Sequence, residues 1–92
     1  MSLHDRRIEF IREYPSGSRR KYDLQVVVDT DQADQQGWFE LYDTDTGGEN
    51  HHEEGGLWFN DRELVDYDGT PCIADEVLDI LDEWNFNTKN MR

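Results

Sequence analysis

The chain has 92 residues, of which 35% are hydrophobic, and its 22 acidic against nine basic residues give a formal net charge of −13. This length suits one domain over residues 1–92, and three Trp, four Tyr and four Phe are too many aromatic residues for a typical disordered segment. One cysteine excludes an internal disulfide, and the sequence contains neither a long apolar run nor a secretion signal. We therefore expect a folded, cytoplasmic protein without a membrane-bound role.

The first part of the chain shows the alternation of apolar and polar residues that is typical of strands. Residues 7–14 alternate in part, and residues 22–28 alternate most regularly. Between them, residues 15–18 contain the Pro, Ser and Gly of a turn. Residues 30–36 are almost entirely polar and are expected to form a loop.

A third strand is expected over residues 38–42. Because successive side chains of a strand point to opposite faces, Phe39 and Leu41 share one face and Trp38 and Tyr42 share the other. One of these faces is expected to lie in the core.

The later part of the chain adds two short strands and a helix. Residues 57–59 and 63–67 are expected strands around a tight hairpin turn at residues 60–62. Apolar residues at helical spacing predict an amphipathic helix over residues 73–84: Ile73, Val77, Ile80, Leu81 and Trp84.

These elements predict an α+β fold, in which a four- to five-stranded antiparallel β-meander carries one C-terminal amphipathic helix packed on one face. The ends of the chain, residues 1–6 and 87–92, are expected to fray.

The charge is strongly segregated along the sequence. Residues 22–88 hold nineteen acids and a single base, Arg62, for a net charge of −18, whereas residues 1–21 carry +3. Such a field repels nucleic acid and anionic lipid and attracts basic surfaces. Direct nucleic-acid binding and membrane binding are therefore not expected, and a basic protein surface is the expected partner.

The segment DTDTGGENHHEE, residues 43–54, resembles a calcium-binding loop in its spacing. Asp43, Asp45, Gly48 and Glu54 occupy its first, third, sixth and twelfth positions. Against this reading, a glycine occupies the fifth position, where an oxygen ligand is expected, and the expected flanking elements are strands instead of helices. The alternatives are a calcium- or other metal-binding module and a long hairpin loop.

Other candidate sites have less support. Adjacent His51 and His52 could bind zinc or nickel, but neighbouring residues of an extended chain point in opposite directions, so a solvated loop is the alternative. Cys72 is expected to be a small buried thiol. The sequence lacks a phosphate-binding glycine loop, a nucleophile elbow and a zinc-protease motif, so we expect no enzyme and no cofactor.

The remaining candidate is the acidic surface itself. The residues expected to bind a partner are Asp75, Glu76, Asp79, Asp82 and Glu83 on the helix, Asp29, Asp31 and Asp34 near the 30–36 loop, and Trp38 and Trp58 as aromatic anchors. They suggest a small protein that binds a basic surface of a partner, in the sharpest version as a nucleic-acid mimic that inhibits or regulates a nucleic-acid-binding protein. A structural domain with no separable activity is the alternative.

Overall fold

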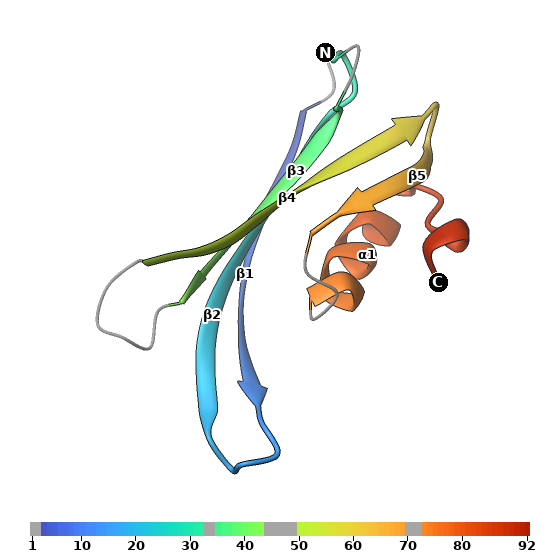
Figure 1. Cartoon of the computed structure of the whole chain (residues 1–92). Coiled ribbons are helices and arrows are strands. Elements are labelled where there is room, and N and C mark those ends of the chain that lie inside the picture. The colour runs from blue at the N-terminus through green and yellow to red at the C-terminus, as the bar shows by residue number, and fades with distance from the viewer. Residues whose placement is uncertain (1–2, 33–34, 44–49, 70–72) are drawn as a thin grey trace.

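Five consecutive strands pair with their sequence neighbours to form one antiparallel sheet, and a helix follows them (Figure 1). The computed structural model describes residues 3–32, 35–43, 50–69 and 73–92, and only the backbone of residues 50–52. In chain order the elements are β1 (Leu3–Glu13), β2 (Arg19–Asp29), β3 (Gly37–Asp43), β4 (Asn50–Asn60), β5 (Glu63–Asp68), α1 (Ala74–Glu83) and the short 3-10 helix η2 (Lys89–Met91). The predicted α+β meander with a C-terminal helix is confirmed.

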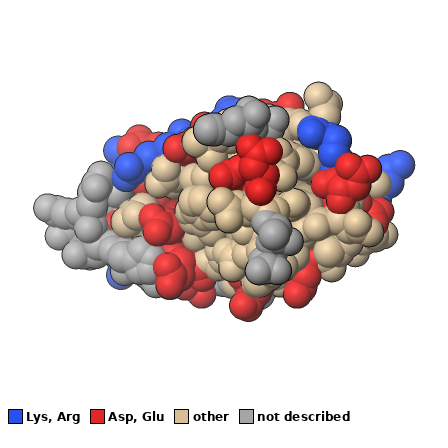
Figure 2. Space-filling view, turned by 90° about the horizontal axis from the view of Figure 1, so that it is seen from above, with Lys and Arg blue, Asp and Glu red and all other residues tan. Residues whose placement is uncertain are grey.

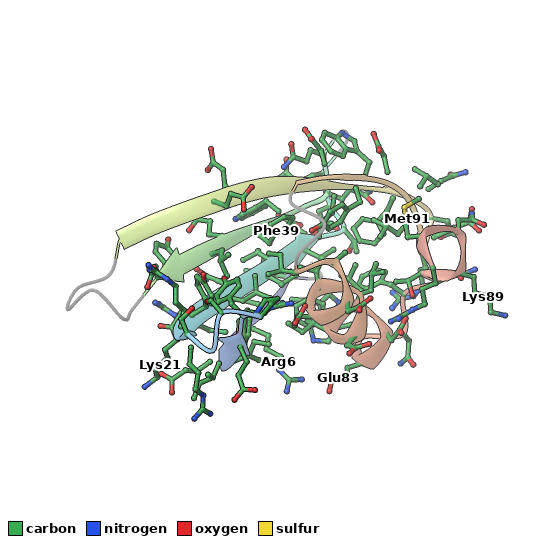
Figure 3. The ribbon with its side chains drawn as sticks, turned by 60° about the horizontal axis from the view of Figure 1, so that its bottom comes forward. Arg6, Lys21, Phe39, Glu83, Lys89 and Met91 are labelled. Carbon is green, nitrogen blue, oxygen red and sulfur yellow. The ribbon has the colours of Figure 1, made fainter. Side chains whose placement is uncertain are left out.

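The core lies between one face of this sheet and α1. The regular alternation of β2 buries Leu24, Val26 and Val28 completely. Their antiparallel register places Leu24 opposite Leu41 and Val26 opposite Phe39 on β3. Figure 3 shows Phe39 between the sheet and the helix. The inner stripe of α1 completes the core with Val77, Leu78, Ile80 and Leu81, all buried.

The helix α1 has 10 residues. In the part of the chain that the structure describes, no helix is long and apolar enough to cross a membrane.

Strand β4 is much longer than the sequence predicts. We expected a strand only over residues 57–59, but pairing with β3 begins at Asn50. The first half of β4 is polar or glycine and therefore lacks the apolar alternation that identifies a strand. Its strand conformation comes from hydrogen bonding to β3 instead of from side-chain pattern. The prediction of one continuous loop over residues 43–54 is wrong for its second half.

The chain ends pack against the rest of the fold. Leu3 already belongs to β1, although residues 1–6 were expected to fray. In the tail, Asn87 lies beside the edge of β5, where its carbonyl accepts a hydrogen bond of 2.9 Å from Leu64 N. Thr88 is buried, with 3% of its surface exposed. Residues 87–92, which were expected to fray, thus contact β5 and α1 through backbone and polar side-chain groups.

Candidate binding site on the open face of the sheet

Strand β1 supplies cations to the helix surface that was predicted to bind a partner. Arg12 Nη2 donates a hydrogen bond of 2.7 Å to Glu76 Oε1. About two helical turns further on, Arg6 forms an ion pair with Glu83 (Figure 3). Even-numbered residues of β1 face α1, so these arginines approach the helix from the sheet.

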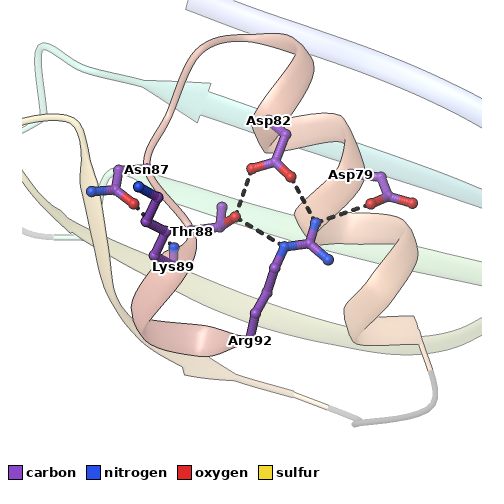
Figure 4. A network of polar contacts seen from close by, with 6 residues as sticks. All are labelled: Asp79, Asp82, Asn87, Thr88, Lys89 and Arg92. Carbon is purple, nitrogen blue, oxygen red and sulfur yellow. Dashed lines mark hydrogen bonds and ion pairs between the residues drawn. The ribbon is translucent and has the colours of Figure 1, made fainter.

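A third cation, Arg92, reaches α1 from the tail (Figure 4). Arg92 Nη2 contacts Asp79 Oδ1 at 3.0 Å and Asp82 Oδ2 at 2.7 Å. Thr88 Oγ1 donates a hydrogen bond of 2.6 Å to Asp82 Oδ1, and this bond, followed by the Arg92 contact, lowers the pKa of Asp82 below its ordinary value. Asp75 is the one helix acid for which the described residues provide no cation.

The helix surface is therefore not the uncompensated anionic face that the sequence suggests. The compensating arginines come from β1 and from the tail, which the sequence alone does not place beside α1. Arg6 and Arg92 also stabilise the last turn of α1, which has no basic residue of its own.

Asp29, beside the 30–36 loop, has a local role. Asp29 Oδ1 accepts a hydrogen bond of 3.0 Å from Asp31 N, and its Oδ2 accepts one of 3.3 Å from Gln32 Nε2. Such bonds from an Asp to the backbone two residues on shape a turn. Asp34 lies outside the described residues.

Two of the predicted calcium ligands, Asp43 and Glu54, lie on opposite faces of the sheet. Asp43 lies opposite Tyr22 on the helix side of the sheet and receives a hydrogen bond of 2.7 Å from Arg20 Nη1, which raises the pKa of Arg20. Glu54 lies opposite Glu40 and points to the other side. Within the described residues, no three His, Cys, Asp or Glu side chains form a group that could hold a metal ion. Asp45, Gly48, Cys72 and the side chains of His51 and His52 lie outside them.

The acids without a compensating cation gather elsewhere. Six carboxylates on β3, β4, β5 and the turn between the last two have no described cation at ion-pair distance: Glu40, Glu53, Asp61, Glu63, Asp66 and Asp68. The nearby Arg62 is directed to the tail, where its Nη2 donates to Trp84 O at 2.6 Å and its guanidinium lies 4.4 Å from the Phe86 ring centroid. Along the lower edge of Figure 2, acidic side chains accordingly lie with few basic ones beside them.

Three of these acids, Glu40, Asp66 and Asp68, share a face with the two predicted tryptophan anchors. Strand alternation places the following side chains on the side of the sheet opposite α1, which we call the open face: Trp38, Glu40, Glu54, Trp58, Asp66 and Asp68. Gly56 lies among them, opposite Trp38 on β3 and opposite Asp68 on β5. Glu54 and Trp58 precede and follow Gly56 by two residues on the same face of β4. Four side chains therefore surround a position that has none.

This arrangement forms a pocket of about 460 Å³, which we call the tryptophan pocket. Its lining consists of Gln35, Trp38, Phe39, Glu54, Gly55, Gly56, Trp58 and Asp68. The Trp58 indole lies against the glycine floor, since a Cβ atom at Gly56 would stand 2.7 Å from Trp58 Cη2. Trp38 is 38% exposed. The pocket combines two indole rings, a side-chain-free floor and two carboxylates.

Sequence reasoning found part of this site. Trp38 and Trp58 were predicted as partner-binding anchors, and both line the pocket. Glu54 was predicted as a metal ligand, whereas Gly56 and Asp68 were not singled out. The signal that could have found them is the pair of glycines two residues before Trp58, because glycine inside a strand often marks a place where another group approaches closely.

Comparisons of the chain with protein-family models, curated proteins and solved structures gave no significant match. A function can therefore be inferred only from the chemistry of the site. Indole faces and carboxylates together suit a cationic group, because both attract positive charge.

Proposed function

We propose that this chain is a cytoplasmic, non-enzymatic protein that binds the basic surface of a partner protein through its open face. The observation that carries the proposal is the separation of charge within the fold. Most cations of β1, β2 and the tail are used in ion pairs, whereas six acids around β3–β5 have no described cation partner. Complementary charge steers association and selects partners, and an exposed tryptophan supplies the contact area that often dominates binding energy.

The partner class that we propose first is a nucleic-acid-binding protein, with this chain as its inhibitor or regulator. Proteins that bind a polyanion carry basic surfaces, and these would be attracted to a chain of net charge −13. The same charge repels nucleic acid and anionic lipid, so neither is proposed as a direct ligand.

The test is affinity capture with the tagged chain at about 0.1 M and about 1 M NaCl, between which the Debye length falls from about 10 Å to about 3 Å. We expect the retained proteins to be basic, to be released at the higher salt concentration and to be displaced by added duplex DNA. Captured proteins that are not basic, or capture that ignores salt, would overturn the proposal.

Two triple variants with the same change in net charge test which acids are needed to capture the partner. The test variant combines Glu40→Gln, Asp61→Asn and Asp66→Asn, all outside the tryptophan pocket. The control variant changes net charge equally at three acids that pair with cations of the β1–β2 hairpin: Glu9→Gln, Glu13→Gln and Asp23→Asn. We expect capture to fall in the test variant only, and equal capture by both would show that the wrong surface was assigned.

A further inference from the structure

We propose that the tryptophan pocket binds an arginine side chain of the partner, which makes it the specific anchor of the interaction. This inference rests on the proposed function and specifies which group of the partner is bound and where. It starts from the four-fold arrangement around Gly56, where Trp38 and Asp68 face each other across the glycine and Glu54 and Trp58 flank it along β4.

Glycine forms the floor of the pocket and lets the Trp58 indole lie directly over it. A methyl group at Gly56 would stand 2.7 Å from Trp58 Cη2 and 2.8 Å from its Cζ3, closer than any normal contact. Alanine here would push the Trp58 indole away from its place over the glycine. The glycine thus allows the indole to lie against the strand backbone, where it forms one wall of the pocket.

The lining selects a cation. An anionic ligand would meet Glu54, Asp68 and the overall charge of −13. A purely apolar ligand would cover the Asp68 carboxylate without offering it a hydrogen-bond donor, which is unfavourable. A cation over an indole face is attracted by the ring and by the carboxylates at once.

Among cations, the guanidinium group fits best. It is planar, weakly hydrated and able to stack on aromatic rings while its N–H groups donate to carboxylates, whereas a lysine ammonium is compact and strongly hydrated. A pocket of about 460 Å³ is larger than one side chain requires, so it also leaves room for the adjoining backbone of the partner.

The chain contains an internal control for a binding experiment. Its three tryptophans give three indole N–H signals in a nitrogen–proton correlation spectrum. Two of them line the pocket, and Trp84 lies away from it, stacked on His4 with ring centroids 5.1 Å apart. Titration with the peptide acetyl-Gly-Arg-Gly-amide should shift the signals of Trp38 and Trp58 and leave that of Trp84 unchanged, with a Kd of about 1 mM for so small a ligand.

Peptides that differ only in the central residue test the chemistry. Citrulline has the shape of arginine without its charge, and we expect it to bind at least about tenfold more weakly. Lysine should also bind more weakly. Citrulline binding as tightly as arginine, or trimethyllysine binding more tightly, would overturn the assignment of the pocket to a guanidinium group.

Two variants test the location. Asp68→Asn should weaken arginine binding by about tenfold, whereas Glu63→Gln, a matched acid of β5 outside the pocket, should leave it unchanged. Gly56→Ala should abolish the shifts at both pocket tryptophans. Unaltered binding in Asp68→Asn and Gly56→Ala would overturn the proposal.

Failure of the arginine assignment is distinguishable from failure of the proposed function. Salt-sensitive capture of basic proteins without peptide binding would remove the pocket assignment alone. Peptide binding without any such capture would remove the proposed function and with it the role of the pocket as an anchor.

Discussion

The buried hydroxyl group of Tyr22 shows how strongly the fold acts on a single residue. Tyr22 is 5% exposed, and its hydroxyl oxygen lies 2.7 Å from that of Tyr14. Burial, together with the hydrogen bond to Tyr14, raises the pKa of Tyr22 from 10.0 to about 12. Since the neutral phenol is favoured in the folded state, the contribution of Tyr22 to stability is complete below pH 10.

We predict that this contribution is lost as the pH rises from 10.0 to about 12. The unfolded chain releases the Tyr22 proton near the lower value and the folded chain near the higher one, so deprotonation favours unfolding between them. Near-ultraviolet absorbance of tyrosinate, followed with circular dichroism, should show one late-titrating tyrosine. In Tyr22→Phe that titration should disappear, and its persistence would contradict the assignment.

For single residues, the sequence predicts the face of the sheet on which a side chain lies better than it predicts the side chain's ion-pair partner. The alternation around Phe39 correctly separates it from Trp38, because a strand fixes which side each residue takes. Ion pairs follow no such rule. Arg12 and Glu76 are 64 positions apart, so only the packing of β1 beside α1 brings them together.

Two ion pairs connect β1 to α1, and the Arg12 pair is the less exposed. The side chains of Arg12 and Glu76 are 31% and 28% exposed, and the second carboxylate oxygen of Glu76 is buried without a described hydrogen-bond partner. By contrast, Arg19 and Glu13 form an exposed pair within the β1–β2 hairpin, at 63% and 71%.

We predict that Arg12→Ala lowers the free energy of unfolding by about 1–3 kcal/mol, because it leaves a partly buried carboxylate without its cation. The matched change Arg19→Ala should cost less than about 0.5 kcal/mol, as expected for an exposed pair. Urea unfolding of both variants measures the difference. Equal costs would show that the Arg12–Glu76 pair does not connect the sheet to the helix.

The tail is fastened to α1 through Thr88. The substitution Thr88→Val preserves the shape of this buried side chain but removes the hydroxyl group that donates a hydrogen bond to Asp82. We predict a loss of about 1 kcal/mol in the free energy of unfolding at neutral pH, and little change in the control Lys89→Ala, whose exposed side chain makes no described contact.

The effect of Thr88→Val should depend on pH. The hydrogen bond lowers the pKa of Asp82 from its ordinary 3.8, so its stabilising effect is present above pH 3.8 and is lost as the pH falls through the folded-state pKa. Urea unfolding of wild type and variant should therefore converge in acid. A constant difference would contradict this role of the ionised carboxylate.

At the scale of elements, periodicity predicted β2, β3, β5 and α1 well because each has one buried face. It missed the first half of β4 and the docking of the tail. Both are held by hydrogen bonds to neighbours distant in sequence, which leave no apolar period to detect.

The whole molecule carries excess negative charge that its few cations do not balance. Self-repulsion at −13 destabilises the compact state, while the ion pairs on its surface contribute little each. We predict that about 1 M NaCl raises the unfolding temperature by about 4–8 °C relative to about 0.1 M, corresponding to roughly 1 kcal/mol. Differential scanning calorimetry measures the change.

The charge variant Asp66→Lys provides the control for this prediction. Asp66 is exposed on β5 among uncompensated acids, so reversal should raise the unfolding temperature at low salt and reduce its salt dependence. An unfolding temperature that falls with added salt would show that the ion pairs outweigh the repulsion.

The adjacent glycines of β4 leave only backbone between the two sides of the sheet. Gly55 lies under the Phe39 ring, since a Cβ there would stand 2.3 Å from Phe39 Cζ. Phe39 is fully buried from solvent on the core side, and it also belongs to the lining of the pocket. A ligand on the open face would thus be separated from a core residue by little more than strand backbone. Amide hydrogens of β4 should then exchange more slowly when arginine peptide is added, and their protection factors should rise by a factor that approaches one plus the ratio of peptide concentration to Kd.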